Sequence, residues 1–159
     1  MHTREAIAEA WLERILRTYP SQASQFMKNE KDAFRNPVGH AFREALPILL
    51  DELLLGMDKD RILPALDAVI RIRAVQAFTA SQAVAFIFQL KDILRGSCPD
   101  ADLGQLYGRI DELALMAFDI FQQCREKVCQ SRVEETRRRV FVLERVMRGR
   151  EPEGWKERN

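Results

Sequence analysis

The segment from Ile70 to Gly96 constrains the fold of this chain more than any other. It reads IRIRAVQAFTASQAVAFIFQLKDILRG, in which two apolar stretches meet at Thr79. Thr79 and Gln82 have the spacing of a capping box, a pair of reciprocal hydrogen bonds that begins a helix. Helices that are apolar on most sides lie in protein interiors, where polar groups must be paired. We therefore predict two buried helices, whose arginines and glutamines belong either to a specified core or to a binding pocket.

The composition indicates one folded domain. With 159 residues, of which 47% are apolar and 31% charged, the chain can bury a core and is too apolar to be disordered. A formal charge of +1 argues against a dedicated nucleic-acid-binding protein. No apolar run reaches the roughly 18 residues of a membrane span, and the first residues lack a hydrophobic signal segment. We therefore expect a cytoplasmic protein that binds neither nucleic acid nor membranes.

The cysteines do not suggest a functional site. The three residues, Cys98, Cys124 and Cys129, are an odd and sparse set, unlike the disulfide framework of a secreted protein. Cys124 and Cys129 stand about 140° apart around an expected helix, so they point to different sides. We expect unreactive thiols, no shared metal and no cofactor.

Apolar residues recur at spacings of three and four along nearly the whole chain, and no strand-like alternation is found. We predict an all-α fold of five or six helices, packed as a bundle or in a globin-like arrangement, with a long C-terminal helix. Asn36, Pro37 and Gly39 are expected to break any helix in an irregular piece at residues 28–39. The predicted helices cover residues 3–19, 21–27, 40–55, about 58–78, 80–95, and 102 almost to the end.

The C-terminal helix carries two apolar seams in succession. Both have the spacing of packed bundle helices, and the second is shifted by one residue. The second seam is sparse and lies among charged residues, so we expect Val140, Leu143 and Met147 to pair with a helix of another subunit. Residues 149–159 are expected to form a flexible tail on a domain of residues 1–148. The first seam is Leu103, Leu106, Ile110, Leu113, Ala117, Phe121, Cys124 and Val128; the second is Cys129, Val133, Thr136, Val140, Leu143 and Met147.

Two arginines of the apolar segment are candidates for a site. Arg71 lies four residues after Asp67, the spacing of a surface ion pair. Arg73 falls on an apolar stripe and should face inward, where a guanidinium needs a carboxylate or several carbonyls. A structural ion pair is our favoured interpretation, and a bidentate clamp on an anionic ligand is the alternative. Arg71, Arg73 and the nearby Gln76 are therefore candidate contacts for a ligand or partner.

The corner FRNPVG, residues 34–39, places Arg35 and Asn36 beside Phe34 and Val38, which we expect to anchor it. A rigid turn is the favoured interpretation, and Arg35 and Asn36 are further candidate contacts for a ligand or partner.

His40 is the only histidine besides His2, and two histidines are too few for a zinc site or a serine triad. One histidine is enough for a haem ligand, although no other feature marks a haem pocket. No catalytic or metal-binding motif is found.

Four segments resemble a known family. They are WLERILRTYP at residues 11–20, FRNPVG at 34–39, IRIRAVQAFTASQAVAFIFQLK at 70–91, and IDELALMAFDIFQQCREKV at 110–128. Together, over most of residues 5–145, they resemble the N-terminal domain of RsbRD-type co-antagonists of RsbT. In that family the domain is a helical sensor-type module, and the related RsbR sensor domains are globin-like dimers that bind no haem.

The resemblance implies a bacterial, non-enzymatic, stressosome-like signalling domain. Members usually precede a STAS domain that carries the phosphorylated residue and docks RsbT. This sequence ends at Asn159 without one, so we carry over no phosphorylation site and expect the sensory half alone. We expect a cytoplasmic homodimer that responds to a small effector or to a regulatory protein, through a pocket or interface within residues 40–95. The alternatives are a haem- or metal-dependent sensor that uses His40, and a structural adaptor without a ligand.

Overall fold

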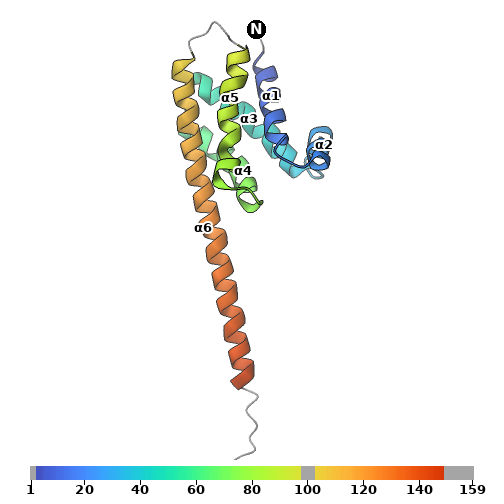
Figure 1. Cartoon of the computed structure of the whole chain (residues 1–159), viewed down its shortest axis with the longest axis vertical. Coiled ribbons are helices and arrows are strands. Elements are labelled where there is room, and N and C mark those ends of the chain that lie inside the picture. The colour runs from blue at the N-terminus through green and yellow to red at the C-terminus, as the bar shows by residue number, and fades with distance from the viewer. Residues whose placement is uncertain (1–2, 98–102, 149–159) are drawn as a thin grey trace, which may run out of the picture. The chain divides into compact units, whose positions relative to one another are not determined.

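The computed structural model describes residues 3–97 and 103–148, which form six helices (Figure 1). The all-α prediction, with its long C-terminal helix, is confirmed. By its internal contacts the chain divides into two units, one up to Cys124 and one from Arg125 onward. The helices are α1 (Arg4–Leu16), α2 (Ser21–Asn29), α3 (Pro37–Leu55), α4 (Lys59–Val75), α5 (Ala80–Ser97) and α6 (Gly104–Arg148).

Several helices begin where a side chain accepts a hydrogen bond from one of their first amide groups. The Thr3 hydroxyl accepts a hydrogen bond from the Ala6 amide at 3.3 Å, and Asp58 accepts one from Asp60 at 3.0 Å. The capping box at Thr79 is confirmed: the Thr79 amide donates to Gln82 Oε1 at 3.0 Å, and the Gln82 amide donates to Thr79 Oγ1 at 3.3 Å. These bonds pair donors that would otherwise lack an intrahelical acceptor.

Several predicted helix boundaries were wrong. We expected Asn36, Pro37 and Gly39 to break any helix, but Asn36 caps α3 and Pro37 is its first residue. Proline suits this position because the first amide of a helix has no intrahelical acceptor. We also expected the helix that begins at about residue 58 to reach Phe78, but this helix, α4, ends at Val75. The helix predicted for residues 80–95 extends further, because Gly96 and Ser97 belong to α5.

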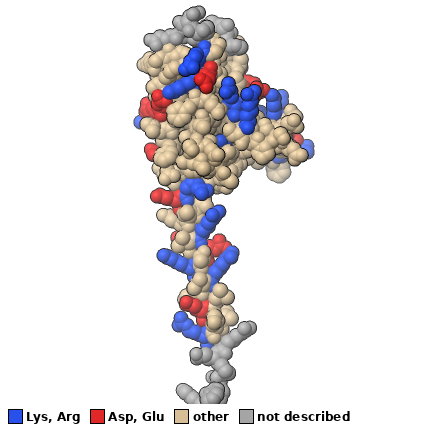
Figure 2. Space-filling view, viewed as in Figure 1, with Lys and Arg blue, Asp and Glu red and all other residues tan. Residues whose placement is uncertain are grey.

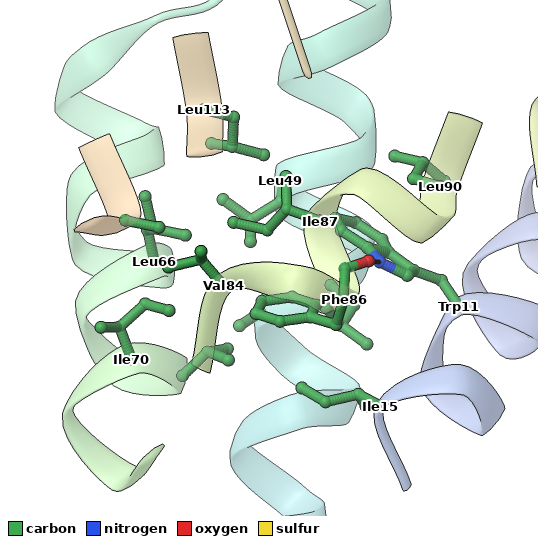
Figure 3. Close-up of a cluster of buried hydrophobic side chains, with 14 of the residues drawn as sticks. Trp11, Ile15, Leu49, Leu66, Ile70, Val84, Phe86, Ile87, Leu90 and Leu113 are labelled. Carbon is green, nitrogen blue, oxygen red and sulfur yellow. Dashed lines mark hydrogen bonds between the residues drawn. The ribbon is translucent and has the colours of Figure 1, made fainter. Parts of the chain in front are cut away.

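In the first unit, α1, α3, α4, α5 and the beginning of α6 surround one apolar core (Figure 3). Trp11 of α1 is fully buried in it and lies against Phe86 of α5, with ring centroids 5.8 Å apart. The indole nitrogen donates to the Phe86 carbonyl at 2.8 Å, which pairs the one polar atom of this buried side chain. From α6, the core receives Ile110, Leu113, Ala114, Ala117, Phe121 and Cys124.

The second unit contains the part of α6 from Arg125 to Arg148, where every residue except the half-buried Val128 is exposed. Figure 2 shows acidic and basic side chains interspersed along this part, with uncharged surface between them. The predicted tail at residues 149–159 lies outside the described residues. None of the helices in the described ranges is both long and apolar enough to cross a membrane.

Candidate functional site

Arg73, the strongest candidate from the sequence, is fully buried where α1, α4 and α5 meet. Its Nε donates to the Ala83 carbonyl at 3.0 Å, and its Nη2 donates to the Gln82 carbonyl at 3.0 Å. On the other side, its Nη1 donates to the Thr18 hydroxyl at 3.1 Å. The side chain therefore links the first turn of α5 to the chain just after α1.

Aromatic rings and a tyrosine hydroxyl complete the surroundings of Arg73. Its guanidinium carbon lies 4.1 Å from the centroid of the Phe78 ring, a distance at which the ring face attracts a cation. The Tyr19 hydroxyl accepts a weaker bond from Nη1 at 3.4 Å and donates to Gln76 Oε1 at 2.8 Å. Arg73, Tyr19 and Gln76 thus form one connected polar cluster, which we call the Arg73 cluster.

No carboxylate contacts Arg73 among the described residues, so the favoured ion pair was wrong and the carbonyls are the partners. Burial lowers the pKa of the Arg73 guanidinium, and it raises the pKa of the Tyr19 hydroxyl. The position of Arg73 in the last turn of α4 offsets part of the cost, because the C-terminal end of a helix favours a cation. An anion could reach this cation only by displacing acceptors that already hold it, which favours a structural role for the Arg73 cluster.

Arg71 lies two residues from Arg73 but faces outward. Its Nε and Nη2 donate to the two carboxylate oxygens of Asp67, each at 3.0 Å. The Asp67 carboxylate raises the pKa of the Arg71 guanidinium. The structure therefore brings Arg73 and Gln76 together and separates Arg71 from them.

The FRNPVG corner is a helix cap. Asn36 is buried; its Oδ1 accepts from the Gly39 amide at 2.9 Å, and its Nδ2 donates to the carbonyls of Met27 and Glu30 at 2.9 and 2.7 Å. A Cβ atom at position 39 would lie 2.3 Å from Asn36 Nδ2, so the cap requires glycine there. The motif therefore joins the end of α2 to the start of α3.

Two neighbours of this cap are exposed. Phe34, expected as an anchor, has 95% of its surface accessible, so that expectation was wrong. Arg35 is exposed as well and forms an ion pair with Glu30 at 3.3 Å. The sequence did not single out Arg43, whose Nη2 donates to the Lys28 carbonyl at 2.8 Å and also to the Met27 carbonyl, at the C-terminal end of α2.

His40 occupies the first turns of α3, with its side chain 41% exposed. Its Nε2 lies 3.2 Å from a carboxylate oxygen of Glu44, one turn further along the same helix. Among the described residues, no three histidine, cysteine or acidic side chains gather as a metal site requires.

The sequence missed a groove between α1 and α3, which we call the α1–α3 groove. It has a volume of about 300 Å³, an apolar floor and a charged rim. Such a groove depends on how two distant helices pack, and the nearest sequence signal is the small residue Ala8 within an otherwise bulky apolar stripe. The floor is formed by Ala8, Leu12, Phe42, Leu46, Pro47 and Leu50, and the rim by Arg4, Glu5, Glu9, Arg43 and Asp51.

The second seam of α6, from Cys129 to Met147, is exposed along its whole length. Val140, Leu143 and Met147 have 48%, 62% and 72% of their surfaces accessible. The neighbouring Phe141 and Val142 are exposed too, on another side of the helix. This is the largest group of exposed apolar side chains on one helix among the described residues.

Comparison with known proteins identifies one family. The model of the RsbT co-antagonist protein rsbRD N-terminal domain matches residues 5–136, as the sequence resemblance implied. No curated protein and no solved structure matches the chain significantly. The family is one of regulatory signalling domains and not of enzymes. Since the matched residues cover most of the chain, the protein belongs to the family of RsbRD N-terminal domains, which are sensor-type signalling modules.

Proposed function

We propose that this protein is a non-enzymatic cytoplasmic signalling module that works as a homodimer, paired through the second seam of α6. The observation that carries this proposal is the exposed seam itself, because apolar side chains at regular helical spacing are costly to leave in water. Family membership supports a signalling role, and a regulatory protein is the expected recipient of the signal.

The residue types of the seam favour a parallel pair of helices. Its spacing of four, three, four, three and four is that of alternating d and a positions of a heptad repeat. Val133 and Val140 then occupy a positions and Leu143 a d position. β-branched residues at a with leucine at d favour a parallel two-stranded coiled coil.

One pair of charges agrees with the parallel register. Arg139 occupies a g position and Glu144 the e position five residues later, and these two face each other across a parallel dimer. In an antiparallel pair centred on the same seam, Arg139 would meet Arg139 of the second copy. Arg132 and Arg137 have the same spacing and would repel each other across a parallel dimer. We therefore expect the electrostatic preference for the parallel arrangement to be small.

The seam spans fewer than three heptads, which is short for a coiled coil. We therefore expect a reversible dimer whose population depends on protein concentration. Such an interface suits a switch, because a small rotation or slide of α6 would change how the seams fit together. Since α6 is continuous from Gly104 to Arg148, an effector bound among the other helices has a physical route to the seam.

Two double variants test the interface. Val140→Glu with Leu143→Glu places charges in the seam, whereas Phe141→Glu with Val142→Glu places the same charges on exposed positions outside it. Light scattering over a range of protein concentrations should show monomers for the seam variant and dimers for both the wild type and the control. Circular dichroism checks that both variants keep their helices.

A monomeric wild type at every concentration, or a seam variant that dimerises like the control, would contradict the proposal. Dimers that dissociate equally in both variants would show that overall charge, and not the seam, controls association.

A further inference from the structure

The α1–α3 groove has the features of a small-molecule site. Its volume of about 300 Å³ lies at the lower end of the range for ligand pockets, which suits a ligand of modest size. Its floor is apolar, and its polar groups are confined to the rim. In such a site, the apolar floor packs against the body of a ligand, and a few charged groups on the rim determine the orientation of the ligand.

The carboxylate of Asp51 is the most unusual group on the rim. One of its oxygens, Oδ2, accepts a hydrogen bond from Nη2 of Arg4. The other oxygen, Oδ1, is buried and has no hydrogen-bond donor among the described residues. A carboxylate with one oxygen unpaired is costly to bury, and the oxygen that a ligand can reach is Oδ2, which Arg4 now occupies.

Arg4 holds Asp51 only weakly. Its side chain is 52% exposed, and exposed ion pairs contribute little to stability. Arg4 is also the first residue of α1, where the positive end of the helix disfavours a cation. A second cation therefore competes with Arg4 at a small cost.

The rest of the rim also favours a cation. Glu5 and Glu9 add two carboxylates, and the other basic residue, Arg43, is engaged with the carbonyls at the end of α2. Once Arg4 moves aside, the groove presents acceptors above an apolar floor.

We propose that the α1–α3 groove binds a small amphipathic cation, a primary amine on an aliphatic or aromatic body, whose ammonium group takes the place of Arg4 at Asp51. The apolar body would then lie against Ala8 and Pro47, the members of the floor that are not buried. This inference rests on the proposed signalling function, for which it names the class of effector.

Titration of the full chain with three probes of similar shape tests the charge requirement. The probes are 2-phenylethylamine, the neutral 2-phenylethanol and the anionic 3-phenylpropanoate, and amide NMR signals report binding and its location. We expect the amine to bind in the groove about tenfold or more tightly than the alcohol, as a charged hydrogen bond implies. Equal affinities for the three probes, or shifts confined to other surfaces, would overturn the proposal.

Four variants sharpen the test. Asp51→Asn should remove the preference for the amine, and Arg4→Ala should increase affinity because it removes the internal competitor. Asp67→Asn, which changes an exposed ion pair on α4, is the charge-matched control and should have no effect. Ala8→Leu should weaken all binding because it fills the floor. An Arg4→Ala variant with unchanged or weaker amine binding would contradict the competition between the two cations.

Light scattering separates this proposal from the proposed function. A chain that dimerises through its seam but binds no amine would overturn the effector class alone. A chain that binds the amine but stays monomeric would overturn the dimer and leave the groove as a ligand site.

Discussion

The two halves of α6 carry the same kind of apolar seam, yet only the seam of the first half is buried. Ile110, Leu113 and Ala117 are fully buried, whereas Leu143 and Met147 are 62% and 72% exposed. The two seams have the same spacing and differ by a shift of one residue. Periodicity therefore identifies an apolar face, but only tertiary structure shows what covers it.

Polar contacts differ between the two halves in the same way. In the first half, Arg109 donates to the Leu53 carbonyl of α3 at 2.7 Å, and Tyr107 donates to the Lys91 carbonyl of α5 at 3.3 Å. In the second half, the ion pairs join residues of α6 itself, such as Arg148 with Glu144 at 3.6 Å. Two ion pairs of the second half thus form within the helix, whereas its apolar side chains remain exposed.

The largest expected effect is on folding, and it comes from removing the buried Arg73 side chain. Arg73→Ala should lower the free energy of unfolding by about 3 to 5 kcal/mol, because it leaves a cavity and several buried acceptors without a donor. Urea denaturation measures this loss, with Arg71→Ala as an exposed control that should change little. Light scattering should still show a dimer wherever the variant is folded. Equal losses for the two variants would contradict the structural role of Arg73.

A matched pair of truncations in α6 tests the comparison itself. Leu113→Ala should cost about 2 to 5 kcal/mol of unfolding free energy, because it opens a cavity in the core. Leu143→Ala should instead weaken dimerisation and leave the unfolding of the monomer nearly unchanged. Denaturation at several protein concentrations distinguishes the two results. The comparison would be contradicted if the two substitutions destabilised a dilute monomer equally. That result would show that the second seam is buried within a single chain.

A smaller effect tests the register of the two helices. Arg139→Glu and Glu144→Arg each place like charges opposite one another in a parallel homodimer, so each variant should dimerise several-fold more weakly. A mixture of the two variants restores both attractive pairs, so native mass spectrometry should show that the heterodimer predominates. A statistical mixture of homodimers and heterodimers would argue against the parallel register.

The smallest effect concerns an exposed ion pair between α1 and α2. The Lys28 ammonium holds the pKa of the Glu13 carboxyl below its usual value. A lowered carboxyl pKa adds stability above the pKa of the unfolded chain, and this stability is lost as the pH falls through the folded pKa. The Tm of Lys28→Ala should therefore lie slightly below that of the wild type at neutral pH, and the difference should disappear in acid. A constant difference at all pH values would contradict this electrostatic origin.

Local signals in the sequence predicted much of the fold. The helix starts predicted at residue 3, about residue 58 and residue 80 agree with the caps at Thr3, Asp58 and Thr79, because capping depends on residues only two or three positions apart. The same argument failed at Pro37, because proline can end one helix or begin another. The inward position of Arg73 followed from its stripe, but its acceptor on Thr18 lies 55 residues away in the sequence.

Features that depend on packing could not be predicted in this way. Phe34 was expected to be an anchor because it is apolar, yet nearly all of its surface is exposed. The α1–α3 groove needs two helices to lie side by side, and the contact between Arg4 and Asp51 spans 47 residues. No spacing within one helix contains this information.

Cys129 allows the most direct test of pairing through the second seam. It is exposed and occupies a d position, so in a parallel dimer it faces Cys129 of the second copy. After mild oxidation of a Cys98→Ser variant, peptide mapping should identify a disulfide between the two Cys129 residues, and a further Cys129→Ser change should abolish the linked dimer. A protein that stays unlinked and monomeric under these conditions would contradict the account, and an unlinked dimer would contradict the parallel register.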